Sequence, residues 1–359
     1  MTSTQQNNSK GKKLDGVKYL LALNQENSRI FQDPGTALER RKYREQHPTE
    51  IAVLKCMDGR LNLPVMTNTA LGIIQPWRNL GGRFDLGWPL FALTMKDWVD
   101  YAINRGRDCL VIITYHYAKG DVHRGCRGFN YDVDAARAFT AELNKQFDSV
   151  FGKKVVYTIR CGIETDLDTL ILHGEGGEVL DVSSISDHSS ENVVEILRKM
   201  YPQMPFAILK DLLPLIQGNI EHIAEIKDAK RPITDAEHKE WVLAVGRGFD
   251  WLHEINTTLI VGPYDPDLAG AIRTAAGILR TNLEEKRITE EKGIVLMTSA
   301  PYRDPAGPEP HLAAEKAKFL NRFSFEIIKK DVPELLPYLQ RLTMRVDMNT
   351  RQAEVLEQD

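Results

Sequence analysis

Two stretches of this chain begin as short apolar runs rich in β-branched residues and then end in side chains that a protein core excludes. The first is IAVLKCMDGR, at residues 51–60, and the second is VIITYHYAKGDVHRGC, at residues 111–126. Runs of this kind form buried strands of a parallel sheet. The polar residues after each run then lie at the carboxyl ends of strands, where open α/β folds bind ligands. The pattern predicts a parallel α/β sheet with a functional site at that edge.

Helical patterns alternate with these strands in the first half of the chain. We expect strands at residues 49–56, 109–115 and 155–161, and helices at residues 90–105 and 132–151. The third strand is expected to form a hairpin with residues 169–172. The alternating order favours parallel strands joined by right-handed crossovers.

The chain of 359 residues is long enough for two domains with separate cores. Residues 1–45 read as a polar tail, disordered over 1–13, followed by a helical arm packed on the body or on a partner. Residues 46–182 are predicted to form the α/β domain that carries both motifs and the functional site, and residues 183–250 a helical connection. Residues 251–359 are predicted to form a second α/β half, with strands at residues 257–261, 293–298 and 342–348.

Short segments of the second half repeat segments of the first in the same order. TMRVDMNT (343–350) matches TIRCGIET (158–165), VLMTS (295–299) matches VIITY (111–115), and TAAGI (274–278) matches TALGI (69–73). In this alignment Ala300 falls on His116, and Pro263 and Pro310 fall near Cys56 and Cys126. The predicted fold is therefore a mostly parallel sheet flanked by helices, internally duplicated, whose second copy lacks the cysteines and the histidine of the first. The alternative is two unrelated α/β domains with similar strand composition.

The polar residues at the two strand ends have the composition of a zinc site. Cys56, Cys126 and one histidine, either His116 or His123, supply three ligands, and a catalytic zinc keeps its fourth position for water. Asp58 and Arg60 are spaced to form an ion pair beside the metal, in which Asp58 orients that water. The alternative is a strand-end cysteine next to an Asp-Gly turn with a surface salt bridge. Cys109 and Cys161 lie in or beside apolar runs and are expected to be buried small hydrophobic residues.

The order of these motifs resembles the β-class carbonic anhydrases. Cys-x-Asp-x-Arg, followed by His and Cys after a later strand, is similar to that family's motif, and RNLGG at residues 78–82 is similar to its Arg-Asn-x-Gly turn. The resemblance covers roughly residues 45–165. It implies a zinc enzyme that interconverts carbon dioxide and bicarbonate, with Asp58 and Arg60 as the dyad that gates the fourth zinc position.

Two departures from the family pattern bear on the ligand set. Gly59 stands where the family usually has Ser, and the properties of the family's histidine are divided between two residues. His116 ends the strand, whereas His123 has the usual spacing of three residues before Cys126. A longer loop between histidine and cysteine, with a second half that lacks ligands, resembles the carboxysome-shell carbonic anhydrases. We therefore favour His116 as the ligand, with His123 as the alternative.

Two further residues are candidates for substrate binding. Gln75 precedes the RNLGG turn and is placed to donate a hydrogen bond to bicarbonate, although a surface position in the turn is an equal alternative. Gly81 lies within that turn, where glycine allows the backbone to approach a ligand closely.

We expect zinc-dependent hydration of carbon dioxide to bicarbonate through attack of zinc-bound hydroxide. One alternative is a hydrolase of carbon disulfide or carbonyl sulfide on the same scaffold. Another is a non-catalytic protein with structural zinc, or one that binds a compartment shell, in which both histidines and both cysteines close the site.

The composition of the chain limits the classes of partner and the compartment that we expect for it. The net charge of −4 shows no electrostatic footprint for a nucleic acid. No apolar run approaches the roughly 18 residues of a membrane span. The polar start lacks a signal peptide and the cysteines are few, so a cytoplasmic location is expected, which includes the interior of a bacterial microcompartment. We expect a homo-oligomer, with a compartment shell or another enzyme as the alternative partner.

Overall fold

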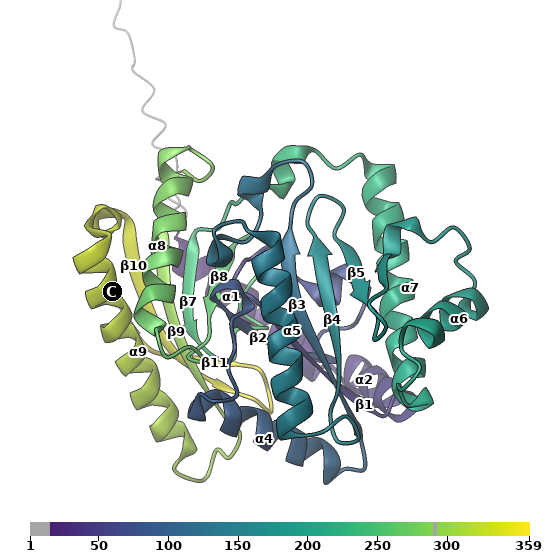
Figure 1. Cartoon of the computed structure of the whole chain (residues 1–359). Helices are drawn as coiled ribbons and strands as arrows, with labels where there is room; N and C mark the ends of the chain where they lie inside the picture. Colours follow the sequence, from purple (N-terminus) through teal and green to yellow (C-terminus); the bar gives the residue numbers. More distant parts are fainter. Residues whose placement is uncertain (1–14, 290–292) are drawn as a thin grey trace, which may run out of the picture.

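The computed structural model of the protein describes residues 15–289 and 293–359 (Figure 1). The predicted disordered tail at residues 1–13 lies outside the described residues. The fold is α/β, with two mostly parallel sheets flanked by helices. One sheet has six strands in the order β2-β1-β3-β4-β5-β6, and the other has five in the order β11-β10-β9-β7-β8. The predicted fold class is therefore confirmed at this level.

The first sheet consists of β1 (Thr49–Cys56), β2 (Ile74–Asn79), β3 (Asp108–Tyr117), β4 (Tyr157–Glu164), β5 (Thr169–His173) and β6 (Val179–Asp181). The first four strands run parallel, and β5 returns antiparallel to β4. The three predicted strands and the predicted hairpin are confirmed. Strands β2 and β6 were not predicted, because Pro76 interrupts the first and the second is only three residues long.

Helices cover both faces of this sheet. Helices α4 (Pro89–Ile103) and α5 (Val133–Val150) contact β3, and both confirm predicted helices. The Asp132 side chain caps α5 by accepting a hydrogen bond from the backbone N–H of Ala135. Helix α7 (Phe206–Ala229) contacts β1, β3 and β5, and α3 (Leu63–Met66) and α6 (Ser190–Met200) pack beside it.

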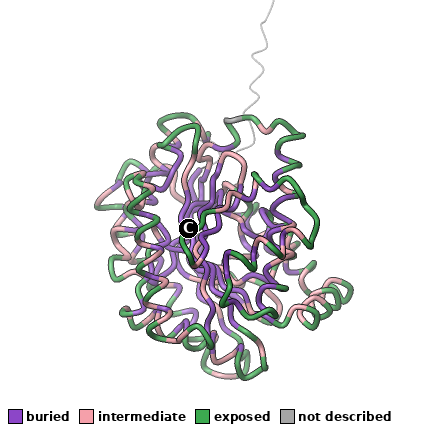
Figure 2. Tube along the Cα trace, turned by 45° about the vertical axis from the view of Figure 1, so that its right-hand side comes forward, coloured by how far each residue is buried: buried purple, intermediate pink, exposed green. Residues whose placement is uncertain are grey.

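The second sheet consists of β7 (Val242–Gly246), β8 (Thr258–Val261), β9 (Ile294–Tyr302), β10 (Leu339–Asp347) and β11 (Ala353–Gln358). Helices α8 (Leu268–Glu284) and α9 (Glu309–Asp331) cover its outer side (Figure 1). The expectation that residues 183–250 form only a helical connection is wrong at its end, because β7 lies between β8 and β9 in this sheet. In Figure 2 the strands of both sheets form the buried centre of the molecule.

The two sheets share one strand order. Strands β8, β7, β9, β10 and β11 follow one another as β2, β1, β3, β4 and β5 do, with four parallel strands and a final antiparallel one. Two of the matched segments lie on corresponding strands, 295–299 on β9 and 343–350 on β10 and the turn after it.

Two details of the predicted alignment are wrong. Residues 274–278 are helical in α8, whereas residues 69–73 form the turn before β2. The counterpart of β1 is β7 and not β8, because β7 is the strand that pairs with β9 as β1 pairs with β3. In that register Gly246 corresponds to Cys56, in place of the Pro263 inferred from sequence.

The predicted helical arm packs on the body of the protein. It forms α1 (Gly16–Gln32) and α2 (Pro34–Gln46), which are separated at Asp33, whose side chain caps α2. Val17 and Leu20 of α1 are buried, and the Asn24 side-chain amide donates to the carbonyl oxygens of Trp251 and Arg351 at 3.2 and 3.0 Å. These contacts bind the arm to the second half.

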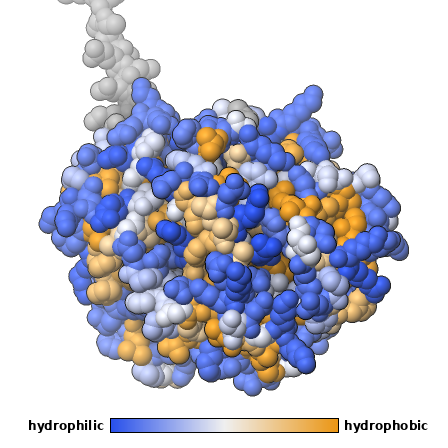
Figure 3. Space-filling model, in the orientation of Figure 1, coloured by the Kyte–Doolittle hydropathy of each residue, from blue (hydrophilic) through white to orange (hydrophobic). Residues whose placement is uncertain are grey.

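None of the described helices is both long and apolar enough to cross a bilayer. The face in Figure 3 is largely hydrophilic, with apolar side chains in small separate groups.

Candidate metal centre

The structure brings Cys56, His116 and Cys126 together at the carboxyl ends of β1 and β3. One ligand atom from each lies within 4.8 Å of the others. Strands β1 and β3 are parallel neighbours with Leu54 opposite Ile113, so Cys56 and His116 reach the same edge of the sheet. Cys126 enters from the loop after β3. All three side chains are buried, with relative exposures of 5, 2 and 4%.

The geometry of the cluster fits a tetrahedral metal ion. The two sulfur atoms lie 4.0 Å apart, and a tetrahedral zinc with Zn–S bonds of about 2.3 Å separates two sulfurs by about 3.8 Å. Neither ring nitrogen of His116 has a hydrogen-bond partner among the described residues, although both are buried. Buried polar atoms are rarely left unpaired. A metal bound at the cluster would engage one of these nitrogens.

The two thiols also influence each other. The hydrogen bond with Cys126, together with burial, raises the pKa of the Cys56 thiol well above its usual value. The same bond lowers the pKa of the Cys126 thiol. Without a cation one thiol therefore keeps its proton more firmly than the other. A bound divalent cation favours loss of both protons, since thiolates are the metal-binding form.

The other two cysteines lie outside this cluster. Burial raises the pKa of both Cys109 and Cys161 to about 12. Both are buried free thiols that pack in the core, as predicted.

Asp58 and Arg60 form a buried, two-point ion pair beside the cluster. The Arg60 Nη2 lies 2.6 Å from Asp58 Oδ2, and its Nε lies 3.0 Å from Oδ1. Burial by itself raises the pKa of Asp58, but the charges of Arg60 and nearby histidines bring this pKa well below its usual value. Asp58 Oδ2 is 3.8 Å from His116 Nδ1. An ionised carboxylate therefore stands next to the proposed metal ligands.

Sequence analysis missed two residues of this site, His238 and Glu240. His238 Nε2 lies 3.0 Å from Arg60 Nη2, and its Nδ1 lies 3.0 Å from Glu240 Oε2. Glu240 is fully buried and also accepts a hydrogen bond from the Gly59 backbone N–H at 3.1 Å. Burial raises the pKa of Glu240, yet the adjacent His238 ring leaves it below the usual value. These two residues lie just before β7 and contact the loop that carries Asp58 and Arg60.

Asp58, His238 and Glu240 form a second group with the spacing of metal ligands. The Arg60 guanidinium already lies within hydrogen-bond distance of Asp58 and His238. A cation in this group would have to displace that guanidinium. The cluster of the two cysteines and His116 is therefore the better candidate for a metal centre.

The unusual Gly59 is explained by the packing of the second half. A Cβ at this position would lie 2.8 Å from the Thr258 carbonyl oxygen and 3.0 Å from Glu240 Cγ. The loop is further bound to the second half by hydrogen bonds from the N–H of Asn256 to the Gly59 carbonyl and from the N–H of Ile260 to the Met57 carbonyl. The serine that the related motif carries does not fit here.

Gly59→Ser is accordingly expected to destabilise the protein by about 1–3 kcal/mol, the usual cost of overpacking. Chemical denaturation with urea measures this loss. Gly277→Ser is the matched control, because a Cβ at Gly277 meets nothing within 4 Å. Equal stability of the two variants would contradict the packing explanation.

The remaining candidate residues lie apart from the cluster. His123 is exposed and contacts the edge of the Tyr131 ring, with ring centroids 5.2 Å apart. Gln75 lines a cavity between the two halves, to which none of the three cluster residues contributes, so the structure does not bring it to the metal centre.

Gly81 holds the turn after β2 against the loop of Cys126. It has a φ of +66°, and a Cβ on Gly128 would lie 2.6 Å from its Cα. Two glycines thus let these two loops touch, which fixes Cys126 near Cys56. The predicted contact between Gly81 and substrate stays a prediction.

The chain matches no protein-family model and no curated protein. Its own residues form a buried site with two thiols and an imidazole, beside a carboxylate that a guanidinium keeps ionised. Such a site can hold a metal ion and orient a water molecule bound nearby.

Proposed function

We propose that this protein is a zinc-dependent carbonic anhydrase similar to the β-class enzymes, interconverting carbon dioxide and bicarbonate. The observation that carries the proposal is the joint presence of the Cys56–His116–Cys126 cluster and the Asp58–Arg60 ion pair at one sheet edge. Two thiolates and one imidazole suit zinc, and three protein ligands leave a fourth position for water or substrate.

When bound, zinc supplies a Lewis acid that makes water nucleophilic near neutral pH. Asp58 accepts a hydrogen bond from the attacking water and so orients its lone pair toward carbon dioxide. Arg60 acts on Asp58 and not on substrate, because its other hydrogen bonds go to the carbonyl oxygens of Ala236 and Arg124, each at 2.7 Å, and to His238 Nε2 at 3.0 Å. It therefore holds the carboxylate ionised and in position.

His238 extends this arrangement toward solvent. The relative exposure of its side chain is 14%, whereas that of Asp58 is 4% and that of Glu240 is 0%. Glu240 fixes the ring through Nδ1. An imidazole in this place is suited to carry a proton between the dyad and bulk water.

A structural zinc site would need a fourth protein ligand. The second histidine considered from sequence, His123, is exposed and packs on Tyr131. This placement supports the catalytic alternative over the closed site.

We also propose that the chain contains an internal duplication with a degenerate second copy, as in the carboxysome-shell carbonic anhydrases. The shared strand order of the two sheets supports it. Gly246 and Ala300 correspond to Cys56 and His116, and they line a small cavity of about 190 Å³ in place of a metal cluster. The second half would then pack as a second subunit does and supply His238.

The four free, buried cysteines suit a reducing compartment and support the predicted cytoplasmic location.

The substrate is tested by comparing carbon dioxide, carbonyl sulfide and carbon disulfide with the same zinc-loaded protein. We expect carbon dioxide to be the fastest substrate, and Cys126→Ser to be inactive with all three. Turnover of a sulfur compound without hydration of carbon dioxide would reassign the protein to the hydrolases of those compounds.

A further inference from the structure

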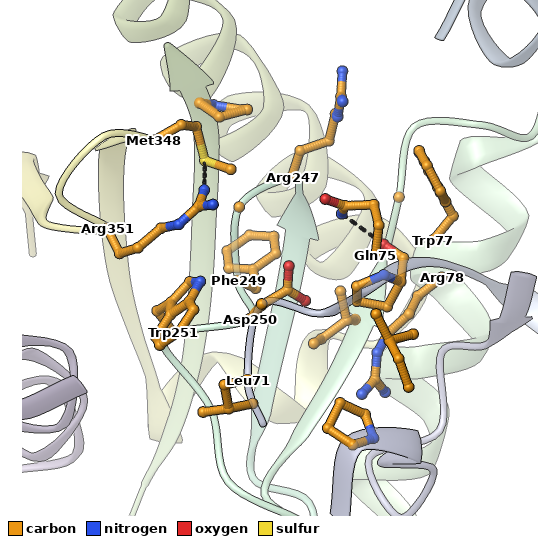
Figure 4. Close-up of a pocket in the computed structure, with 18 of the residues that line it drawn as sticks. Leu71, Gln75, Trp77, Arg78, Arg247, Phe249, Asp250, Trp251, Met348 and Arg351 are labelled. Carbon is orange, nitrogen blue, oxygen red and sulfur yellow. Dashed lines mark hydrogen bonds between the residues drawn. The ribbon is translucent and has the colours of Figure 1, made fainter. Parts of the chain in front are cut away.

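A second, much larger cavity lies between the two halves and has no role in the proposed reaction. Its volume is about 1180 Å³. One wall comes from β1 and β2, and the opposite wall comes from the segment after β7 and from the turn between β10 and β11 (Figure 4). None of Cys56, His116 and Cys126 lines it.

The cavity is lined by cationic side chains without carboxylate partners. The inner four are Lys55, Arg78, Arg247 and Arg351, and Arg44, Arg105 and Arg303 complete the set. Over residues 15–289 and 293–359, the ion pairs within 4.0 Å all involve other lysines, arginines and histidines. Burial and the neighbouring Arg78 lower the pKa of Lys55 well below its usual value, so the charge of the lining rests on its six arginines. A concave surface with six arginines outside any ion pair attracts anions.

The carboxylates on the lining do not neutralise this charge. There are five, namely Glu50, Asp97, Asp250, Glu254 and Glu309. Three have donors elsewhere: Arg107 for Glu50, Tyr19 for Glu254 and the backbone amides of residues 303 and 304 for Glu309. Asp97 is exposed on α4, which leaves Asp250 as the one inner carboxylate of the described lining.

Asp250 lies among Arg78, Arg247 and Arg351 in Figure 4. Burial raises the pKa of this carboxyl even with these cations and Lys55 nearby. One carboxylate therefore faces three guanidinium groups. The excess positive charge needs another source of compensation, since an uncompensated charge away from water is costly.

The inner cations are held in place by neutral acceptors. Lys55 Nζ donates to the Leu61 carbonyl at 2.9 Å, and Arg78 donates to the carbonyls of Asp58 and Leu61, each at 2.9 Å. Arg351 donates to the Met348 sulfur at 3.1 Å, and a thioether is a weak acceptor. The Nε atoms of Arg78 and Arg351 are buried and have no hydrogen-bond partner among the described residues. Donors with unused capacity thus surround the cavity.

We propose that this cavity binds a small organic polyanion, a phosphate ester or a polycarboxylate, between Arg247 and Arg351. Guanidinium groups bind the oxygens of both anions in pairs. The volume exceeds the roughly 300–1,000 Å³ of common ligand sites, so a single inorganic ion would leave it mostly filled with water. Trp77 and Trp251 provide apolar wall for the organic part. The proposal does not depend on the reaction at the metal centre.

Isothermal titration calorimetry of the full-length protein, at constant ionic strength and without chloride, tests the proposal. Pyrophosphate represents the phosphate esters and tricarballylate the polycarboxylates. At least one probe is expected to bind with a sub-millimolar Kd, and the stronger one identifies the ligand class. The double variant Arg247→Gln/Arg351→Gln is expected to weaken that binding at least tenfold, whereas Arg198→Gln, an exposed arginine on α6, leaves it unchanged.

Two further variants keep the outcome decisive. If the double variant fails to fold, the exposed Arg303→Gln alone is expected to weaken binding several-fold. Cys126→Ser shows whether a metal at the cysteines contributes, and unchanged affinity is expected. The proposal is overturned if neither probe binds at millimolar concentration, or if binding survives the arginine substitutions and disappears in Cys126→Ser.

Discussion

Replacing His116 by alanine is expected to remove zinc from the protein and to abolish carbon dioxide hydration. The imidazole is buried and is one of three proposed ligands, and the other histidine considered from sequence, His123, is exposed and outside the cluster. Loss of residues that only support a ligand already costs about 10–100-fold in metal affinity or activity. Loss of a ligand itself should lower metal affinity and activity by more than this factor. Zinc content by elemental analysis and the hydration rate per chain measure both effects.

His123→Ala is the matched control for this prediction. It removes an imidazole seven residues away in the same segment, yet zinc content and activity should stay within twofold of the wild type. The opposite pattern, with zinc lost in His123→Ala and kept in His116→Ala, would move the ligand to His123 and contradict the geometry described above.

The second large effect is expected from Asp58→Asn. The asparagine amide is neutral, so Arg60 is left as a buried cation without its partner. Removal of one member of a buried ion pair lowers the free energy of unfolding by about 3–5 kcal/mol. Activity should fall by about 10²–10⁴-fold, the range attributed to a positioned proton acceptor. Zinc content should not change, because the three ligands remain. Urea unfolding and steady-state hydration rates, taken together with metal analysis, check these outcomes.

A second variant separates the stability effect from the catalytic one. Asp58→Asn/Arg60→Met removes both charges, so it should regain part of the lost stability but none of the lost activity. Full activity in zinc-loaded Asp58→Asn would show that the carboxylate does not orient the reacting water.

The sequence predicts four strands of the first sheet, β1, β3, β4 and β5, and the three residues of the cluster, because local pattern determines both. Apolar β-branched runs specify β1 and β3, and their parallel pairing places Cys56 and His116 together. The preference for His116 over His123 rests on the resemblance to the carboxysome-shell enzymes, through the longer loop between histidine and cysteine and the second half without ligands. The structure places His116 in the cluster.

The features that the sequence did not predict depend on contacts between residues far apart in the chain. Strand β7 has only five residues, two of them Ala and Gly, so its pattern is weak. His238 lies 178 residues from Arg60 and carries no motif of its own. The match between residues 69–73 and 274–278 failed because similar composition occurs in a turn and in a helix.

The reaction itself is tested most directly by stopped-flow hydration of carbon dioxide with samples loaded to different zinc contents. We predict a rate above the buffer background that rises in proportion to zinc, up to one ion per chain, and that is absent in Cys126→Ser. A fully zinc-loaded protein with no hydration above background would contradict the assignment as a carbonic anhydrase.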